Sequence, residues 1–308
     1  MKSTVLGRPG AGLEVPVVGL GCMRMGLQGV AGEAERAHRT IRRALDAGVT
    51  FLDTADMYVR GVNEEIVGAA IAGRRDEVQL ATKFGVVRGD GDEFSLRGDA
   101  AYARPACEAS LRRLGVDVID LYYLHRRDPE VPIEESVGAM AELVAAGKVR
   151  HIGLSEVTGQ ELRAAHSVHP VTALQSQWSV AAREVEEVVP VCAELGIGVV
   201  PWSPQAQGTL SATDDSRDAE FDTTFPGDPG LPGRVRALAA RLSLPPAAIT
   251  HAWISARSRH WGVPVAPVFG TTTPERIDEL VAGAAVTVPD ELLDELDPVA
   301  PRPAPAHR

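Results

Sequence analysis

The sequence predicts an α/β protein of the (β/α)8 TIM barrel class, preceded by a β-hairpin and closed by a C-terminal helix. Eight short apolar segments with the character of strands alternate with amphipathic segments of helical period, which is the pattern of parallel α/β folds. A closed barrel of eight such repeats needs about 250 residues. The chain has 308 residues, of which 44% are hydrophobic. We therefore expect a single domain over residues 1–308.

The first element is a hairpin. Residues 7–12 are rich in Gly, lie between two short apolar segments and predict a hairpin within residues 4–20, before a first main strand at 15–20. Residues 206–233, by contrast, are rich in Asp, Thr, Gly and Pro. We expect a long surface loop there rather than a domain boundary.

The remaining elements follow from hydrophobic period and from the residues that bound them. Short apolar runs between turns predict strands, and a 3.6-residue period predicts helices. Strands are expected at 49–53, 77–83, 118–124, 151–154, 171–175, 197–202 and 264–268. Helices are expected at 33–47, 64–72, 105–114, 133–146, 159–166, 185–195, 234–242, 246–256, 274–281 and 290–296.

Two glycine motifs suggest other folds but are incomplete. A doubly wound sheet would carry a phosphate-binding glycine pattern after its first strand. The segment from Gly19 to Arg24 begins that pattern, but Arg24 replaces the third glycine and no helix follows directly. The segment from Gly153 to Val157 resembles a nucleophile elbow without its final glycine, which argues against Ser155 as a hydrolase nucleophile.

Charge and composition exclude several function classes. The net charge of −11, without a block of Lys or Arg, argues against nucleic-acid or membrane partners. Cys22, Cys107 and Cys192 are far apart, so neither a metal site nor a disulfide framework is expected. Without a leader segment or an apolar run of about 18 residues, a cytoplasmic protein is expected. The sequence carries no sign of the oligomeric state.

The stretch from Gly48 to Tyr58 is the centre of the functional prediction. Its short apolar strand ends at Asp53, and an ionised carboxylate at the exit of a buried strand needs a cation or several donors. A structural role would be to cap the helix that begins near Val62, but Asp53 lies too far upstream. A functional site is therefore favoured.

Three more polar side chains occupy comparable positions. Lys83 ends the third strand, His125 ends the fourth, and Tyr58 lies on the loop after the second. Singly, they are explained as a surface cation, a core histidine and a loop anchor. The C-terminal ends of barrel strands share one rim, however, so all four side chains are expected to meet there.

Together these residues predict a proton-delivery site for carbonyl reduction. An ammonium on Lys83 lowers the pKa of a nearby phenol, Tyr58, while Asp53 keeps Lys83 charged. Tyr58 can then protonate a developing alkoxide, and His125 can donate a hydrogen bond to the carbonyl oxygen. These residues contain no hydride donor, so the reaction requires a cofactor.

Several motifs occur along nearly the whole chain: GLGCM at 19–23, DTADMY at 53–58, NEEIVG at 63–68, ATK at 81–83, IDLYYLHRRDP at 119–129, GKVRHIGLS at 147–155, PWSP at 201–204 and GT at 270–271. In this order they resemble the aldo-keto reductase family. The resemblance implies a (β/α)8 barrel, a nicotinamide dinucleotide across the rim, and the tetrad Asp53, Tyr58, Lys83 and His125 in the roles given above.

The resemblance also implies which residues hold the cofactor, expected to be NADPH with NADH as the alternative. Ser155, Glu156 and Gln175 match positions that hold the nicotinamide carboxamide, and Trp202 matches the aromatic residue that stacks on the nicotinamide ring. The other expected contacts are Ser203, Gln205 and Gln207 at the pyrophosphate, Gly270, Thr271, Thr272, Arg276 and Glu279 at the adenosine half, and Cys22 and Met23 after the first strand.

Three departures from the family pattern concern the cofactor. Glu156 stands where Asn is usual, and a carboxylate accepts hydrogen bonds but cannot donate one. Leu280 replaces an Asn that contacts adenine, and Thr272 and Thr273 occupy positions that are often basic. Arg276 is thus the main candidate to pair with a 2′-phosphate, and we expect weaker selectivity for NADPH than a more basic pocket would give.

Reduction of a small-molecule aldehyde or ketone is the favoured activity, with two alternatives. Lys83 would act as a Schiff-base amine in a lyase, and the chain would bind cofactor without turnover as a sensing subunit, although the intact tetrad argues against the latter. The substrate is set by the rim loops 86–97, 126–131 and 206–233, which carry no readable pattern. Trp178 either lines the pocket or plugs the top of the barrel.

Overall fold

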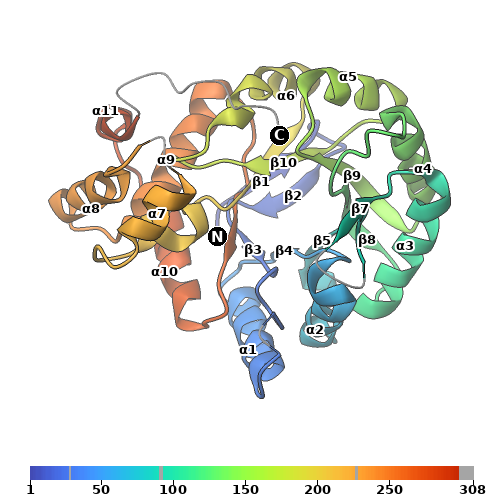
Figure 1. Ribbon diagram of the computed structural model, residues 1–308, viewed down its shortest axis with the longest axis horizontal. Coiled ribbons are helices and arrows are strands. Elements are labelled where there is room, and N and C mark those ends of the chain that lie inside the picture. Colours follow the sequence, from blue (N-terminus) through green and yellow to red (C-terminus); the bar gives the residue numbers. More distant parts are fainter. Residues whose placement is uncertain (28, 90–92, 226–227, 298–308) are drawn as a thin grey trace.

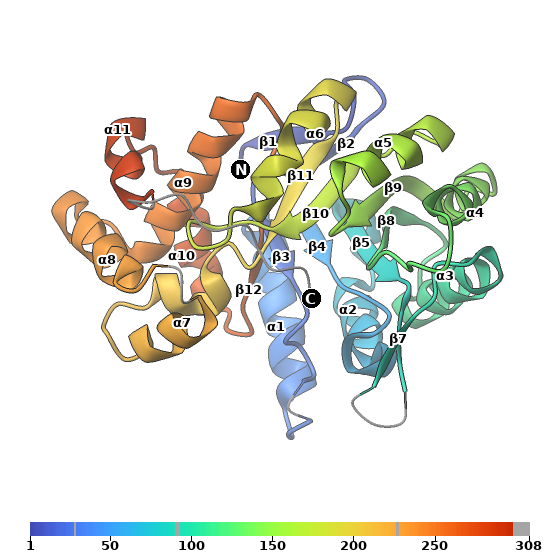
Figure 2. The ribbon, with the colours of Figure 1, turned by 45° about the horizontal axis from the view of Figure 1, so that its top comes forward.

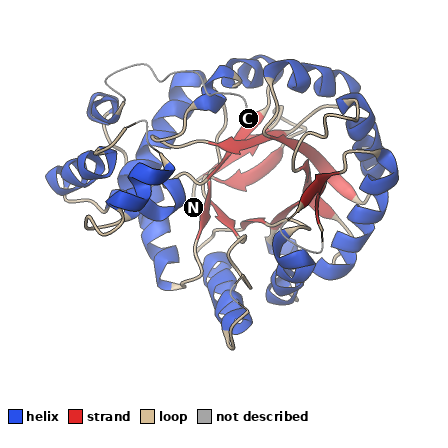
Figure 3. Ribbon diagram, in the orientation of Figure 1, coloured by secondary structure: helices blue, strands red, loops and turns tan. Residues whose placement is uncertain are grey.

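Eight parallel strands form a closed barrel in the computed structural model, which describes residues 1–27, 29–89, 93–225 and 228–297. The strands are β3 (Gly19–Gly21), β4 (Phe51–Asp53), β5 (Gln79–Phe84), β8 (Ile119–Leu124), β9 (Val149–Ser155), β10 (Ala173–Gln177), β11 (Gly198–Trp202) and β12 (Val268–Gly270). Around the barrel their order is β10-β11-β12-β3-β4-β5-β8-β9. Figure 3 shows them as a ring inside the helices, which confirms the predicted fold class.

Helices cover the outside of this barrel (Figure 1). They are α1 (Glu33–Asp46), α2 (Val62–Ile71), α3 (Ala100–Leu114), α4 (Ile133–Ala145), α5 (Gly159–Val168), α6 (Val189–Leu195), α7 (Asp218–Thr224), α8 (Leu231–Leu242), α9 (Pro246–Trp261), α10 (Glu275–Ala284) and α11 (Asp290–Leu293). Short 3-10 turns are η1 (Tyr58–Gly61), η2 (Arg75–Glu77), η3 (Glu184–Glu187), η4 (Ala206–Ser211) and η5 (Asp294–Leu296). In Figures 1 and 2, α7, α8 and α11 lie together beside α9. No helix within the described ranges has the length and apolarity needed to cross a membrane.

The outer helices form because their apolar residues repeat with the helical period. In α1, Ala37, Ile41, Ala44 and Leu45 recur at three- to four-residue spacing and are buried, while charged residues occupy the other face. Side chains of this kind fill the layer between helices and strands. This layer fixes each strand, and hence the side chain at its end.

The N-terminal hairpin closes one end of the barrel. Strands β1 (Ser3–Leu6) and β2 (Leu13–Pro16) pair antiparallel, and Leu6, Leu13 and Val15 join the apolar cluster inside the barrel. A side chain on Gly198, at the start of β11, would lie 2.5 Å from Leu6. Because the hairpin occupies the N-terminal end of the strands, the C-terminal rim is left for the site.

The first main strand differs from its predicted range of 15–20. Val15 pairs with Thr4 in the hairpin, and the barrel strand is β3. Pro16, which has no N–H to donate, is the last residue of β2. Gly19 then passes close to Phe51, where any side chain would clash. The single apolar run at 15–20 is therefore divided between the hairpin and the barrel, which its hydrophobic periodicity does not show.

The expected surface loop at 206–233 is largely helical. It contains η4, α7 and the first turn of α8, while residues 226 and 227 lie outside the described ranges. Phe221 is fully buried, and Asp218 pairs with Arg236 at 2.7 Å. One buried aromatic residue and one ion pair anchor a segment whose polar composition predicts no structure.

The rim loop after β5 also contains secondary structure. It forms a hairpin of β6 (Val86–Arg88) and β7 (Phe94–Leu96).

Candidate active site

The predicted tetrad residues converge at the C-terminal rim of three adjacent strands. Asp53 ends β4, Lys83 lies near the end of β5, and His125 directly follows β8. Lys83 Nζ donates to Asp53 Oδ1 at 2.5 Å and to the carbonyl oxygen of Thr54 at 2.7 Å. Tyr58, at the start of η1, places its ring centroid 5.3 Å from the same Nζ. The strand order therefore assembles the four side chains as the sequence predicts.

Lys83 and Asp53 form a buried ion pair. Lys83 is fully buried and Asp53 is 4% exposed. The other carboxylate oxygen of Asp53 accepts a hydrogen bond from Gln175 Nε2 at 2.8 Å. Burial lowers the pKa of Lys83, but the negative charge of Asp53 and hydrogen bonds to Asp53 and Tyr58 outweigh burial and raise it. The lysine therefore stays charged inside the protein.

Tyr58 is a neutral phenol beside this ammonium. Burial raises the pKa of Tyr58, while the charge of Lys83 and a hydrogen bond to it oppose that rise. The effect of Lys83 has the predicted direction, but burial outweighs it and the net pKa is raised. The loop that presents the phenol is strained, because Val59 and Arg60 have φ values of 49° and 53°. Tyr58 thus carries the proton that general-acid chemistry needs.

His125 completes the tetrad as a neutral imidazole. It is 8% exposed, and its ring lies edge-on to that of Tyr58 with centroids 5.8 Å apart. Burial, followed by the positive charges of Lys83 and Arg126, holds the pKa of His125 well below its usual value. Its Nδ1 has no partner among the described residues. A neutral ring has one N–H to donate, so His125 can hydrogen-bond a substrate oxygen.

Residues behind the tetrad hold its loops in place. Asn63 Nδ2 donates to the carbonyl oxygens of Cys22 at 2.7 Å and Met25 at 2.6 Å, and Thr54 Oγ1 donates to Asn63 Oδ1 at 2.5 Å. These bonds join the chain after β3 to the chain after β4. Asn63 belongs to the motif at 63–68, but its role is not predictable from the sequence because its partners are backbone atoms of distant segments.

The residues expected to hold the nicotinamide lie on β9, β10 and β11, next to the tetrad. Glu156 follows Ser155, and its Oε1 accepts hydrogen bonds from Gln177 N at 2.8 Å and Trp202 Nε1 at 2.7 Å. Glu156 has a φ of 54°, in the left-handed region where Asn is favoured over Glu. The carboxylate thus fixes the indole of Trp202, a task that needs only acceptors.

The residues expected at the pyrophosphate follow β11. Ser203 and Gln207 have φ values of 53° and 58°, and Gln207 N donates to Ser203 Oγ at 2.9 Å. Gln205 lies between them and is partly buried. This turn is wound tightly at the rim, next to Trp202.

The residues expected at the adenosine half follow β12. Gly270 ends this strand, Thr271 and Thr272 follow it, and the carbonyl oxygen of Thr272 accepts a hydrogen bond from Thr40 at 3.0 Å. Arg276 and Glu279 are exposed on α10. Neither forms an ion pair with the described residues, so both are open to a ligand.

The two expected contacts after β3 are arranged differently from each other. Cys22 is fully buried with its Sγ near the Leu20 carbonyl oxygen, and burial raises the pKa of its thiol to about 12. Met23 is 51% exposed. Of this pair, only the Met23 side chain is open to the rim.

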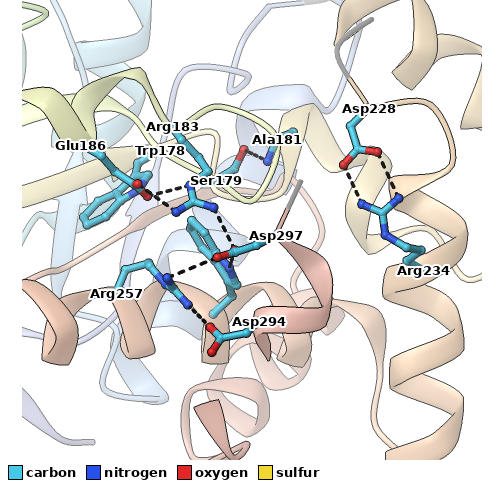
Figure 4. Close-up of polar contacts among 11 residues, drawn as sticks. Trp178, Ser179, Ala181, Arg183, Glu186, Asp228, Arg234, Arg257, Asp294 and Asp297 are labelled. Atoms are coloured by element: carbon cyan, nitrogen blue, oxygen red, sulfur yellow. Dashed lines mark hydrogen bonds and ion pairs between the residues drawn. The ribbon is translucent and has the colours of Figure 1, made fainter. Parts of the chain in front are cut away.

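Two further residues, Trp178 and Arg126, lie on loops that follow barrel strands. Trp178 is fully buried, donates from Nε1 to Glu186 at 3.1 Å and packs edge-on against Trp253, so it is a packing residue rather than a pocket wall (Figure 4). Arg126 was predicted only as part of a substrate loop. Its Nη1 donates to the carbonyl oxygen of His125 at 2.8 Å and to Ser155 Oγ at 3.1 Å.

The rim thus divides into two arcs. The tetrad occupies β4, β5 and β8, and the expected cofactor residues occupy β9 through β12 and the chain after β3. Polar groups and one indole ring line the second arc: Ser155 and Gln175 are buried, Trp202, Ser203 and Gln205 are partly exposed, and Gln207 and Arg276 are exposed. Such a row of polar groups and one aromatic ring fits an elongated dinucleotide whose nicotinamide end lies nearest the tetrad.

Comparisons with known proteins give the following matches. The sequence profile of the aldo/keto reductase family matches residues 17–300. An aldo-keto reductase from Bacillus halodurans in its holo form has a similar structure, with 29% identity, a TM-score of 0.81 and 97% of each chain covered. The glycerol dehydrogenase from Gluconobacter oxydans gives 25% identity, a TM-score of 0.83 and 98% coverage of each chain. An aldo/keto reductase from Klebsiella pneumoniae in complex with NADP and acetate gives 28%, 0.77 and 98% of each.

Proposed function

The chain belongs to the aldo/keto reductase family, and on this premise we propose that it reduces aldehydes or ketones to alcohols with NADPH, using Tyr58 as proton donor. The observation that supports this most is the convergence of a neutral phenol, a neutral imidazole and a buried ammonium at one rim. Carbonyl reduction requires from the protein an acid, a hydrogen-bond donor and a stabilising cation.

The roles follow from these states. His125 donates a hydrogen bond to the substrate oxygen, Tyr58 gives its proton to that oxygen as negative charge develops, and Lys83 stabilises the phenolate left behind. Asp53 and the Thr54 carbonyl oxygen keep the ammonium of Lys83 oriented toward Tyr58. The nicotinamide, when bound, would supply the hydride. The groups that would hold the nicotinamide are Ser155, Gln175 and Trp202.

NADPH is proposed over NADH because Arg276 is exposed at the adenosine arc and free of ion pairs with the described residues. A relative from Klebsiella pneumoniae is described in complex with NADP. The Arg276→Ala variant should lose roughly tenfold in the ratio of NADPH to NADH affinity, measured by fluorescence titration. Arg241→Ala, which removes an exposed arginine paired with Glu295, is the control. An unchanged ratio in Arg276→Ala would refute this assignment.

The other two activities are less well supported. Lys83 is charged and engaged with Asp53 and Thr54, whereas a Schiff-base amine must lose its proton to attack a carbonyl. A sensing subunit has no need for four converging catalytic groups. Borohydride trapping on Lys83 with a carbonyl compound would indicate the lyase, and cofactor binding without any turnover would indicate the sensing subunit.

The direct test is oxidation of NADPH and NADH with a panel of aldehydes, ketones, quinones and pyridoxal. We expect at least one member to be reduced, with one alcohol formed per NADPH oxidised. The proposal fails if every member of the panel leaves both cofactors unoxidised while the protein binds them.

A further inference from the structure

Arg126 is a charged group at the site that the reduction itself does not use. It directly follows His125, and its Nη1 donates to the His125 carbonyl oxygen at 2.8 Å and to Ser155 Oγ at 3.1 Å. These two contacts place the guanidinium over the ends of β8 and β9. Its charge acts on both Tyr58 and His125, which locates it beside the reacting groups.

The guanidinium has one occupied side and one open side. Nη1 uses both of its N–H groups on the two acceptors just named, and within the described residues Nε and Nη2 have no acceptor. The Nε–Nη2 edge of an arginine is a planar fork that matches the two oxygens of a carboxylate. The fork of Arg126 is therefore oriented by the protein and left free.

The neighbouring charges do not neutralise Arg126. Arg127, the next residue, pairs with Glu161 at 3.1 Å, whereas Arg126 has no ion pair with any described carboxylate. Glu156 is the acidic residue that follows Ser155, and its Oε1 is engaged by Gln177 and Trp202. Exposed Arg163 is likewise paired, with Glu194.

Among the tetrad residues and Arg126, the net charge is that of Arg126. Lys83 and Asp53 cancel, and burial keeps Tyr58 and His125 neutral. The positive charge of Arg126 therefore has no ion-pair partner beside His125, while the carboxylate of Glu156 is held by the neutral donors Gln177 and Trp202 next to the expected nicotinamide. An isolated cation at a binding site favours a ligand that brings one negative charge.

We propose that Arg126 binds a carboxylate on the substrate, so that the preferred substrates are aldehydes or ketones that carry a carboxylate on the same small molecule. This inference rests on the proposed reductase function and narrows its substrate class. Nη1 holds the guanidinium in place through His125 and Ser155, and the Nε–Nη2 fork receives the two carboxylate oxygens. Arg126 is thus a substrate-binding residue that determines specificity.

The test compares matched pairs of substrates with NADPH. The pairs are 4-carboxybenzaldehyde with methyl 4-formylbenzoate, and succinic semialdehyde with butanal. For the wild-type protein we expect kcat/KM to be higher for the carboxylate in at least one pair. In Arg126→Gln, that preference should fall roughly 10- to 100-fold, mainly through KM, and Arg126→Lys should restore only part of it. Arg127→Gln is the matched control and should keep the wild-type preference.

The outcomes separate the possible failures. If Arg126→Gln lowers kcat/KM equally for both members of a pair, Arg126 acts through His125 and Ser155, and the carboxylate assignment is wrong. If the wild type reduces the neutral aldehydes but prefers no carboxylate, the substrate class is wrong while the reductase function stands. If it oxidises no NADPH with any of the four but reduces another member of the panel, the carboxylate assignment is wrong and the reductase function stands; if the whole panel fails, both are wrong. Thermal unfolding of each variant verifies that it is folded.

Discussion

Two clusters of charged residues in this protein differ in what sets the charge of their members, which is ion pairing in one and burial in the other. In the C-terminal cluster (Trp178, Arg183, Glu186, Trp253, Arg257, Asp294 and Asp297), every carboxylate meets a guanidinium, with Arg183 held by Glu186 at 2.9 Å and by Asp297 at 2.8 Å (Figure 4). Both guanidinium groups also lie 5.2 Å from the Trp253 ring. In the tetrad, burial instead drives Tyr58 and His125 away from their usual pKa values, and His125 Nδ1 lacks a partner among the described residues.

The contrast separates structure from function. The C-terminal cluster joins the chain after β10, α9 and the end of η5, and its charges act on one another. The tetrad joins neighbouring strands that the barrel already holds, so its charges are not needed for the fold. Opposed and incompletely satisfied groups of this kind mark functional sites. If the distinction holds, substitutions in the two clusters should have different effects on activity and on stability.

Replacing both members of the tetrad ion pair should abolish activity without lowering the free energy of unfolding, whereas replacing Lys83 alone should lower both. Lys83→Met is expected to lower kcat by about 10³-fold and to destabilise the protein, because Asp53 is left as a buried unpaired charge. Adding Asp53→Asn should restore the free energy of unfolding to at least the wild-type value, while activity stays lost. Denaturant titration and NADPH oxidation measure the two effects. Lys148→Met, at a partly exposed lysine paired with Glu108, is the control.

The carboxyl of Asp56, on the loop that carries Tyr58, should make stability depend on pH. Burial, then the charge of Glu64, raises the pKa of Asp56 to about 7. Since the unfolded carboxyl titrates near pH ~4, the native state binds more protons than the unfolded state between these values. Its contribution to stability is therefore complete below pH ~4 and is lost as the pH rises to about 7.

The Asp56→Asn variant tests this sign. Relative to wild type, its free energy of unfolding should gain roughly 2–4 kcal/mol between pH ~4 and pH ~8, as followed by urea titration. Asp46→Asn, at an exposed carboxylate paired with Arg74, should keep the wild-type dependence. Parallel pH curves for wild type and Asp56→Asn would show that Asp56 titrates normally.

Breaking the C-terminal cluster should have the opposite effect to breaking the tetrad. Asp297 accepts from Trp253 Nε1 at 3.2 Å and pairs with Arg183. Asp297→Ala should lower the free energy of unfolding by about 1–3 kcal/mol, because both partners lose an acceptor. The kcat of the folded variant should stay within about twofold of wild type. A large loss of kcat with an unchanged free energy of unfolding would contradict a purely structural role for the C-terminal cluster.

The smallest effect is expected at Glu156, which shares one property with each cluster. Its carboxylate is satisfied by Gln177 and Trp202, yet it orients a ring expected at the nicotinamide. Glu156→Gln keeps an acceptor but weakens both bonds, so NADPH affinity should fall roughly three- to tenfold by fluorescence titration. Glu161→Gln, in the capping box of α5, is the control. Unchanged affinity in Glu156→Gln would remove the positioning role.

The tetrad was predictable because it depends on topology. Once eight strands alternate with helices, the strand ends that carry Asp53, Lys83 and His125 must share a rim, whatever the details of packing. These positions depend on where a strand stops, which a sequence pattern records. The cofactor residues from Ser155 to Arg276, by contrast, are implied only by the resemblance to the aldo-keto reductase family.

Other features depend on contacts that no local pattern contains. The two roles of the 15–20 segment follow from which strand Val15 meets, and the order in 206–233 follows from the burial of Phe221. The free fork of Arg126 could not be read from the sequence, because it differs from paired Arg127 only in what lies opposite it. The acceptor role of Glu156 likewise follows from its distance to Trp202.

The central claim is that Tyr58 gives the proton for carbonyl reduction. Its most direct test is single-turnover oxidation of bound NADPH by Tyr58→Phe, measured beside the NADPH Kd with the best substrate of the panel. Oxidation at least about 100-fold slower than in wild type, with a Kd within about twofold, is the predicted result. Oxidation at the wild-type rate would show that the proton comes from another group and would contradict the account.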